Sequence, residues 1–350
     1  MGSERILTCS FYPKYLHSTS LQSFTYPPLV VAMSSLCLSL PTQGAEDPRA
    51  KREGNCKNVS SASSSNSSSP SKYVTIGSNP SSNPYETAQS VNEYLLMHYG
   101  TLKELMNFPQ IQSTQLQASI NFPRECAEIC GKYVSLLPSS SSSAGVRILD
   151  LGCSVGRSSF ELTRFASEVI GLDYSQAFID VATKLQETGS APYTIRTEGD
   201  LIQSAVARVP DVDRSRVRFI QGDACDLMAS FPSTQFHIVL AANLLCRLPF
   251  PGRFLETVSK IIVTGGYLVM PSPYTWLEQY TPKDEWIGGY IDAKGNEVRS
   301  YDGIKSRLED TGFFTFVEAF DLPFFIRETA RKNQWSVSHV TVWKRTAKQN

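Results

Sequence analysis

The spacing of hydrophobic and polar positions changes near residue 146. Beyond this point short apolar runs predict strands at residues 146–151, 168–172, 217–221, 237–241, 267–270, 313–319 and 336–343. Stretches of helical spacing lie between them, at residues 158–167, 176–188, 251–263 and 304–311, and we expect an extra helix at residues 200–208. Such alternation is typical of a parallel sheet with helices on both faces. We therefore predict an α/β fold with a seven-stranded, mostly parallel sheet, and the last two strands suggest an antiparallel edge.

Two helices are predicted before the first strand. Asn83 can cap the first, Pro84 suits its first turn, and the second covers residues 124–137. Residues 59–71 are almost entirely serine, so they cannot bury enough apolar surface to order. We divide the chain into a disordered leader at residues 1–82, an N-terminal helical cap with its connector at residues 83–145, and a ligand-binding domain at residues 146–346.

Composition narrows the class of protein and its location. The 350 residues carry 33 basic and 33 acidic side chains, and this neutral balance favours a small-molecule substrate over a nucleic acid. The eight cysteines form no Cys-x-x-Cys pair, no metal is implied, and no apolar run is long enough for a membrane span. We expect a cytoplasmic protein, although residues 1–72 hold seven basic and four acidic residues and weakly match an organelle transit peptide.

The segment from Asp150 to Arg157 reads as a strand end, a glycine turn and a helix start. Gly152 and Gly156 allow close approach of a ligand to the backbone. A dinucleotide fingerprint fails here because Ser154 and Arg157 stand where two further glycines belong, and no P-loop lysine follows. The carboxylate of Asp150 suits a ligand with an ammonium group and a cationic centre better than a pyrophosphate. S-adenosylmethionine has both.

The next strands repeat the pattern of a polar residue at the strand end. Asp173 stands where a carboxylate can accept hydrogen bonds from ribose hydroxyls, and Asp223 could accept one from an adenine amino group. Asn243 follows the fourth strand, on the methyl-transfer side. Three acids in this order predict a Rossmann-like class I methyltransferase that binds S-adenosylmethionine. The predicted cofactor-binding residues are Asp150, Gly152, Cys153, Gly156, Asp173, Tyr174, Asp223, Ala224 and Ala241.

A narrower resemblance extends over residues 83–345. The chain resembles the C-terminal methyltransferase domain of ovothiol-biosynthesis enzymes in a set of specific stretches. These are Tyr94-Leu-Leu-Met-His-Tyr-Gly100, Asp150-Leu-Gly-Cys-Ser-Val-Gly-Arg-Ser-Ser-Phe-Glu-Leu162, Gly222-Asp-Ala-Cys225, Ala241-Ala-Asn-Leu-Leu-Cys-Arg-Leu-Pro249, Ser272-Pro-Tyr-Thr-Trp-Leu-Glu278, Pro323-Phe-Phe-Ile-Arg-Glu328 and Arg331-Lys-Asn-Gln-Trp-Ser336. The resemblance implies N-methylation of the imidazole of 5-thiohistidine (4-mercaptohistidine) to give ovothiol.

That family usually fuses the domain to an iron-dependent sulfoxide synthase. The His-x3-His metal pair of such a portion is not found in this sequence. We therefore expect a methyltransferase that acts as a separate protein, with a separate sulfoxide synthase as its candidate partner. The alternatives are a methyltransferase for another small amine or thiol, and a non-catalytic protein that binds S-adenosylmethionine.

The substrate-binding candidates lie mostly after the fourth strand: Asn243, Arg247, Tyr274, Trp276, Arg327 and Trp335. Arg327 could clamp an amino-acid carboxylate through two parallel hydrogen bonds, or form a surface ion pair. Tyr274 and Trp276 could cage a ring or the sulfonium, or pack in the core. Asn243 and His98 are the catalytic candidates, His98 as a base on a covering helix, although a helix-packing role for it is as good an interpretation.

Overall fold

The computed structural model describes residues 83–137 and 145–348, and all of them fall in one compact unit, Lys72–Asn350. The predicted leader and transit peptide, the serine-rich stretch and the serine connector lie outside the described residues. Seven strands form the main sheet, in the order β10-β11-β7-β6-β1-β2-β5. Their bounds are β1 Arg147–Leu151, β2 Glu168–Asp173, β5 Val217–Gln221, β6 Phe236–Leu240, β7 Ile262–Ser272, β10 Phe314–Arg327 and β11 Asn333–Arg345.

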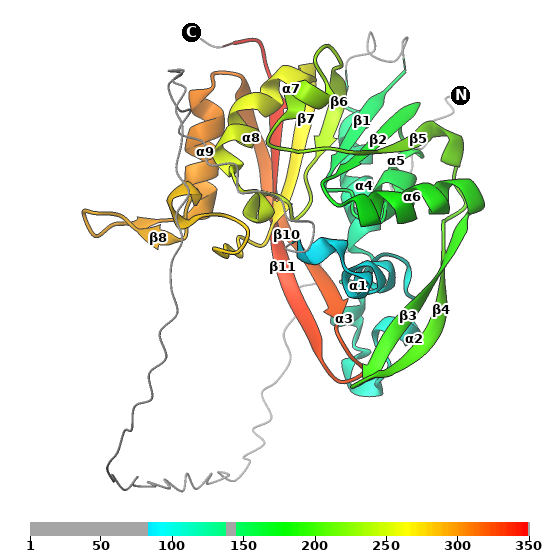
Figure 1. Ribbon diagram of the computed structural model, residues 1–350. Coiled ribbons are helices and arrows are strands. Elements are labelled where there is room, and N and C mark those ends of the chain that lie inside the picture. Colours follow the sequence, from blue (N-terminus) through cyan, green and yellow to red (C-terminus); the bar gives the residue numbers. More distant parts are fainter. Residues whose placement is uncertain (1–82, 138–144, 349–350) are drawn as a thin grey trace, which may run out of the picture. The chain divides into compact units, whose positions relative to one another are not determined.

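Strand directions confirm the predicted mixed sheet (Figure 1). β5, β2, β1, β6 and β7 run parallel, β11 runs antiparallel to β7, and β10 runs antiparallel to β11. The order of the strands switches at β1, which lies between β2 and β6. In sheets of this kind ligands bind beyond the carboxyl ends of the strands at the switch point. The segment that follows Asp150 therefore lies where a ligand is expected.

Helices cover both faces of the sheet because successive strand residues point to opposite sides. Ile148 packs on one face in a core shared with the N-terminal helices, and Leu149 packs on the other. On the first face lie α1 Ala88–Tyr99, α2 Leu102–Leu105, α3 Thr114–Gln117, α4 Phe122–Val134, α5 Arg157–Leu162 and α6 Gln176–Thr188. On the second lie α7 Leu227–Ser230, α8 Pro251–Thr257 and α9 Ser300–Asp310.

Local capping explains where α1 begins. Asn83 accepts a hydrogen bond from the Tyr85 amide at 3.1 Å and caps the short 3-10 helix η2, Pro84–Glu86. Thr87 then caps α1 by accepting from the Ser90 amide at 3.1 Å. These caps satisfy amides at the helix starts that have no partner within the helix. In Figure 1 α1 lies below the parallel strands, and its Tyr99 hydroxyl donates to the Val155 carbonyl in the turn after β1 at 2.9 Å.

The extra helix predicted at residues 200–208 is wrong. The chain instead forms an antiparallel ribbon of β3, Ser190–Glu198, and β4, Leu201–Arg208, joined at Gly199 and Asp200. Gly199 has a φ of +50°, a value that suits a tight hairpin turn. Residues that alternate between buried and exposed along β3 favour a strand. A second, two-residue ribbon joins β8, Tyr290–Ile291, to β9, Glu297–Val298.

Candidate functional site

The turn after β1 is shaped by two left-handed glycines. Gly152 has a φ of +70° and Gly156 a φ of +85°. A Cβ at Gly152 would lie 2.9 Å from the Leu244 side chain, and one at Gly156 would lie 2.7 Å from the ring of Phe219. The amide of Gly152 also donates to the Leu172 carbonyl at 2.8 Å. Glycine is therefore required at both positions, because the backbone lies close to neighbouring side chains and adopts a conformation that other residues resist.

Asp150 places a buried carboxyl at the end of β1. Its side chain is 2 % exposed and accepts a hydrogen bond from the Ser159 hydroxyl at 2.6 Å. Burial raises the pKa of Asp150 to about 7, although the Ser159 hydrogen bond opposes the shift. A carboxyl with this pKa is poised to ionise when a cation lies beside it.

Asp173 ends β2 and faces the same turn. Its carboxylate accepts hydrogen bonds from the Ser154 amide at 2.8 Å and the Ser175 amide at 2.9 Å. Burial raises its pKa to about 6, while these backbone donors oppose the shift. Ser154 has a φ of +51°, and its buried hydroxyl has no hydrogen-bond partner. Buried polar groups are rarely left without a partner, so this hydroxyl indicates a place for a polar ligand.

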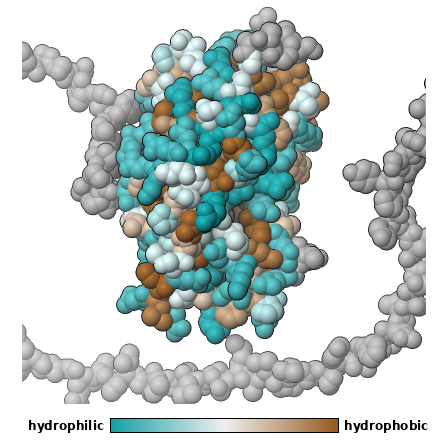
Figure 2. All heavy atoms as spheres, turned by 90° about the vertical axis from the view of Figure 1, so that its right-hand side faces the viewer, coloured by the Kyte–Doolittle hydropathy of each residue, from teal (hydrophilic) through white to brown (hydrophobic). Residues whose placement is uncertain are grey.

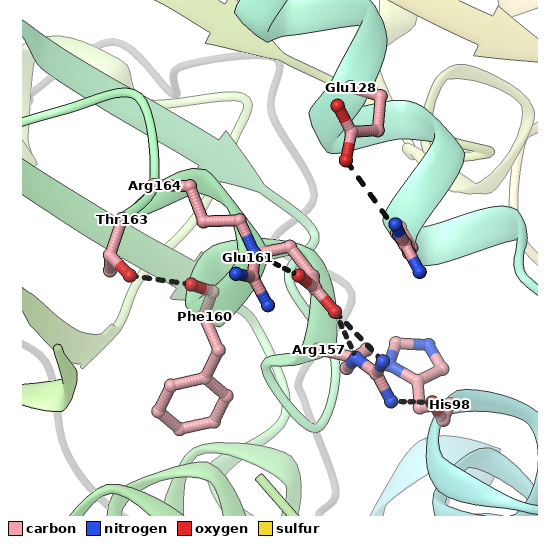
Figure 3. A network of polar contacts seen from close by, with 8 residues as sticks. His98, Glu128, Arg157, Phe160, Glu161, Thr163 and Arg164 are labelled. Atoms are coloured by element: carbon pink, nitrogen blue, oxygen red, sulfur yellow. Dashed lines mark hydrogen bonds and ion pairs between the residues drawn. The ribbon is translucent and has the colours of Figure 1, made fainter. Parts of the chain in front are cut away.

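Arg157 connects the turn to the covering helix α1 (Figure 3). Its guanidinium donates to Glu161 at 2.8 and 3.0 Å and to the backbone carbonyl of His98 at 3.2 Å. The Nδ1 atom of His98 is buried without a partner, and burial lowers the pKa of His98 to about 3, with the positive charge of Arg157 contributing. The ring is therefore neutral but a poor proton acceptor near neutral pH. This geometry argues against His98 as the base and supports its helix-packing interpretation.

The side chains of Tyr85, Tyr94 and Tyr280 form an aromatic cluster that begins at η2, and we call this cluster the aromatic roof. The ring of Tyr85 stacks on Tyr280 with centroids 5.8 Å apart, and Tyr94 meets Tyr85 edge-on at 6.0 Å. The guanidinium of Arg247 lies 4.8 Å from the centroid of Tyr280. Cation–π and stacking contacts of this kind hold the roof to the segments that follow β6 and β7.

The carboxylate of Glu86 fastens the start of the roof to α6. It accepts hydrogen bonds from the backbone amides of Gln176 at 3.0 Å and Ala177 at 3.1 Å. These amides open α6 directly after the Asp173 turn, and an anion is favoured at a helix N-terminus. The roof is therefore attached on the side of β2 as well as on the side of β6.

Asn243 and Tyr274 mark the opposite side, after β6 and β7. Together with Ser154 they are the non-glycine residues of the described chain with a left-handed φ, +52° and +53°. The Asn243 side chain accepts a hydrogen bond from Ser338 at 2.7 Å, and the Tyr274 hydroxyl lies 2.9 Å from Nδ1 of His339. Strain of about 1–3 kcal/mol per residue persists only where the surroundings enforce it, and it tends to occur at functional sites. All three strained residues follow the carboxyl ends of strands.

Arg247 lies beside this pair. It donates to the Thr275 carbonyl at 2.7 Å and to the Thr275 hydroxyl at 3.1 Å, which fixes the guanidinium between the segments after β6 and β7. One planar face of the Arg247 guanidinium packs on the ring of Tyr280. A fixed guanidinium next to aromatic rings can bind a small planar acid.

Comparison with known proteins identifies the domain. Residues 149–270, which extend from β1 to β7, match the family model described as a methyltransferase domain. The chain contains a class I methyltransferase domain. It is a methyltransferase, and S-adenosylmethionine is the cofactor that its sequence predicts.

Similar solved structures share little sequence with the methyltransferase. Magnesium protoporphyrin IX methyltransferase from Synechocystis, solved with bound S-adenosylmethionine, is 13% identical, with a TM-score of 0.39, and the match covers 74% of this chain and 98% of that one. A methyltransferase from Methanosarcina mazei is 18% identical, with a TM-score of 0.37 and coverage of 57% and 92%. The cyclase SpnF is 14% identical, with a TM-score of 0.42 and coverage of 75% and 97%. No curated protein matches the chain.

The residues around the glycine turn fit the cofactor. The partnerless Ser154 hydroxyl, the carboxyls of Asp150 and Asp173, and the glycine turn supply the acceptors and the close backbone approach that such a ligand needs. Asp150 would hold the ammonium group and Asp173 the ribose hydroxyls. Predicted roles for the individual residues stay predictions.

The remaining cofactor candidates lie around the same strand ends. The Asp223 carboxylate accepts from the Cys225 amide at 2.7 Å, with buried Ala224 between them. Ala241 is buried after β6, and Cys153 is buried in the turn. Tyr174 is 51% exposed at the end of β2.

Some substrate candidates are not brought together with Asn243. Arg327 and Trp335 lie near the tip of the β10–β11 hairpin, where Arg327 pairs with Asn333. His339 pairs with Ser272 at the end of β7. The hairpin tip at Asn333 comes six residues before His339 on β11, which corresponds to a distance of about 20 Å. Arg327 is buried and donates to the backbone carbonyls of Thr329 and Glu104. The structure therefore supports neither a carboxylate clamp nor a surface ion pair for it.

Trp276 has a packing role in the structure. Its ring is buried, its indole donates to Ser300 at 2.8 Å, and it stacks on Trp286 with centroids 6.2 Å apart. These contacts lie on the α9 side of the sheet. A caging role for Trp276 has no support in this geometry.

Several residues that complete the site were not predicted from the sequence. Tyr85 and Tyr280 form the roof, and Ser338 and His339 hold Asn243 and Tyr274. Ser338 and His339 are adjacent polar residues that interrupt the alternation of polar and apolar residues from Ser336 to Val342, and this interruption was the available signal. Among the described residues no group of His, Cys, Asp and Glu could hold a metal ion. In the same residues no helix has the length and apolar composition to cross a bilayer.

Proposed function

We propose that this methyltransferase transfers a methyl group to an imidazole nitrogen of 5-thiohistidine, giving ovothiol. The observation that carries the proposal is the fixed guanidinium of Arg247, held by Thr275 and packed on Tyr280, in the same segment after β6 as the strained Asn243. A small amino acid offers a carboxylate for the guanidinium and a planar ring for the aromatic roof. The resemblance to the methyltransferase domain of ovothiol-biosynthesis enzymes selects the imidazole among such acceptors.

The reaction asks the protein mainly for position. The cofactor supplies a methyl group that its sulfonium already activates. Asn243, fixed by Ser338, can orient the acceptor ring through its side-chain amide. The roof of Tyr85 and Tyr280 can exclude water, and alignment of two reactants in a dry site accounts for much of the acceleration in such transfers. The imidazole nitrogen attacks through its lone pair, so its proton leaves before or after transfer.

The deciding experiment is an assay of the full chain with S-adenosylmethionine and 5-thiohistidine, followed by mass spectrometry. We expect a product heavier by one methyl group, with the methyl on a ring nitrogen. Turnover on another amine or thiol, with none on 5-thiohistidine, would favour a different small-molecule methyltransferase. Tight binding of S-adenosylhomocysteine without turnover on any acceptor would favour a non-catalytic binding protein.

Arg247→Lys tests the role of the guanidinium. Lysine keeps the charge but loses the planar fork, so we expect the KM for the acceptor to rise about tenfold. The affinity for S-adenosylhomocysteine should stay unchanged. Arg253→Lys, an exposed position on α8, is the matched control.

We also propose that a separate sulfoxide synthase in the cytoplasm supplies the 5-thiohistidine. This rests on the same resemblance, in which the two activities usually share one chain. Imaging of the tagged full chain, together with purification of its partners, tests both parts. A tagged protein in an organelle would contradict the location.

A further inference from the structure

The ribbon of β3 and β4 has one open edge. β3 is covered along its outer side, where the Thr194 amide donates to Asn92 of α1 at 3.1 Å and its Thr197 carbonyl accepts from Ala330. β4 pairs with β3 alone within the described residues. In Figure 1 β4 is the outermost strand of the ribbon. An exposed strand edge is a template for pairing with another strand.

The hydrogen-bond pattern shows which groups face this edge. The Val209 amide donates to the Gly189 carbonyl at 2.9 Å, so these opposite residues form a hydrogen-bonded pair. Such pairs alternate along an antiparallel ladder. Counting two residues at a time, Ala207, Ala205 and Gln203 bond to β3. The backbone groups of the residues between them, Ile202, Ser204, Val206 and Arg208, therefore point to the open edge.

The edge lacks the features that normally prevent strand association. Residues 201–207 include no charged residue and no proline, and the side chains of Ile202 and Val206 are 63% and 49% exposed. Figure 2, which views the molecule from the right-hand side of Figure 1, shows hydrophobic patches that interrupt the hydrophilic surface. An edge of this kind would aggregate or slip unless a defined partner covers it.

The main sheet provides a contrast within the same molecule. Its edge strand β10 contains Pro323, the acids Glu318 and Asp321, and a bulge between Phe316 and Glu318. All three features discourage edge pairing. One edge strand of the protein is thus protected, and β4 is left suitable for pairing.

The edge is complementary to a second copy of itself. If two β4 strands run antiparallel with a two-fold axis at Ser204, Ile202 of each copy faces Val206 of the other. Asp200 then faces Arg208, and both are exposed and have no ion-pair partner within the described residues. An axis at Gln203 would place Val206 opposite Asp200, and an axis at Ala205 would place Ile202 opposite Arg208. Only the register at Ser204 among these three matches apolar with apolar residues and acid with base.

We propose that two copies of this chain associate through β4, forming a four-stranded antiparallel sheet, β3-β4-β4-β3, across a two-fold axis at Ser204. The interface is isologous, since each strand contributes the same residues to both halves. Its affinity comes from backbone hydrogen bonds and from the Ile202–Val206 contacts. Its register comes from the two Asp200–Arg208 pairs at the ends.

Charge reversal with rescue tests the partner and the register together. Sedimentation of the full chain should give twice the mass of one chain. Asp200→Arg alone and Arg208→Asp alone each set like charges opposite each other, so each should shift the protein to single chains. The double exchange restores opposite charges and should restore the dimer. Asp211→Arg, the same charge change at an exposed site beyond the strand, should leave the mass unchanged.

Hydrogen exchange tests the geometry residue by residue. In the dimer, the edge-facing amides of Ile202, Ser204 and Val206 should exchange as slowly as those of Gln203 and Ala205. In the single-chain variants the edge-facing set alone should become fast. A full chain that sediments as one copy would overturn the proposal, including the case in which a segment from residues 1–82 protects the edge. A dimer that survives both single charge reversals would overturn it as well.

Discussion

Replacing Asp150 by asparagine should separate stability from cofactor binding. The carboxyl is 2% exposed, and burial raises its pKa to about 7 from an ordinary value of 3.8. Between these two values the folded protein holds a proton that the unfolded chain has released. Stability therefore falls as pH rises through this window, and the full penalty is present above about pH 7.

The magnitude follows from the width of the window. The interval between 3.8 and about 7 corresponds to about 4 kcal/mol at 1.36 kcal/mol per pH unit, as an upper value. Asparagine has the same shape and no charge, so the variant should be more stable than the parent near pH 8 without cofactor. Burial also raises the pKa of Asp173, to about 6, and this contributes a pH dependence of stability with the same sign. The stability of the variant therefore still depends on pH.

The assay is urea unfolding at a series of pH values between about 5 and 8, with and without S-adenosylhomocysteine. We expect Asp150→Asn to flatten the pH dependence and to lose most of the ligand-induced stabilisation, because the ammonium group of the ligand loses its partner. Asp211→Asn, an exposed acid, is the control and should change neither quantity. The comparison is between parent and variant, because the lowered pKa of His98 gives both proteins a slope of opposite sign below about pH 6.5. A parent whose stability relative to the variant does not fall as pH rises would refute the reasoning. So would a variant that binds the ligand as tightly as the parent.

Three further predictions concern the glycine turn, the buried Arg327 and the aromatic roof. Gly152→Ala should destabilise the protein by about 1–3 kcal/mol and weaken cofactor binding, because a left-handed φ and a Cβ 2.9 Å from Leu244 are both unfavourable; urea unfolding and calorimetry measure this. Arg327→Ala should lower stability by about 2 kcal/mol through loss of its bonds to backbone carbonyls, and an increase only in the acceptor KM would contradict this. Tyr280→Ala should raise the acceptor KM roughly tenfold by removing the stack on Tyr85, with smaller effects on kcat in steady-state kinetics.

β1, β2 and β6 could be predicted because each is a short apolar run that is buried on both faces. β5 and α6 have the bounds that the pattern predicted, and β2 differs by one residue. The strand β4 was mistaken for a helix because exposed residues, Leu201 and Ile202 among them, obscure the alternation along it. The turn at Gly199 was the better signal. Strands β10 and β11 also continue as a hairpin beyond the ends of the other strands in the sheet, and an apolar pattern does not show such an extension.

The two sides of the site differ in how far apart their residues lie in the sequence. The cofactor side is built from strand ends and the turns that follow them, so Asp150, Ser154 and Asp173 fall within one stretch of the chain. On the acceptor side, Asn243 meets Ser338 across 95 residues, and Tyr274 meets His339 across 65. Both contacts depend on the register between β7 and β11.

That register is the reason why the acceptor side could not be predicted from local patterns. A slip of one residue would exchange the faces of Ser338 and His339, which now point to opposite sides of the sheet. Asn243 would then lose its hydroxyl partner, and the Tyr274 hydroxyl would face a serine rather than an imidazole. The buried neighbours Val340 and Val342 would also move to the opposite face of the sheet, so the packing of β11 enforces the arrangement. The position of the acceptor therefore depends on the same core contacts that hold the antiparallel edge to the sheet.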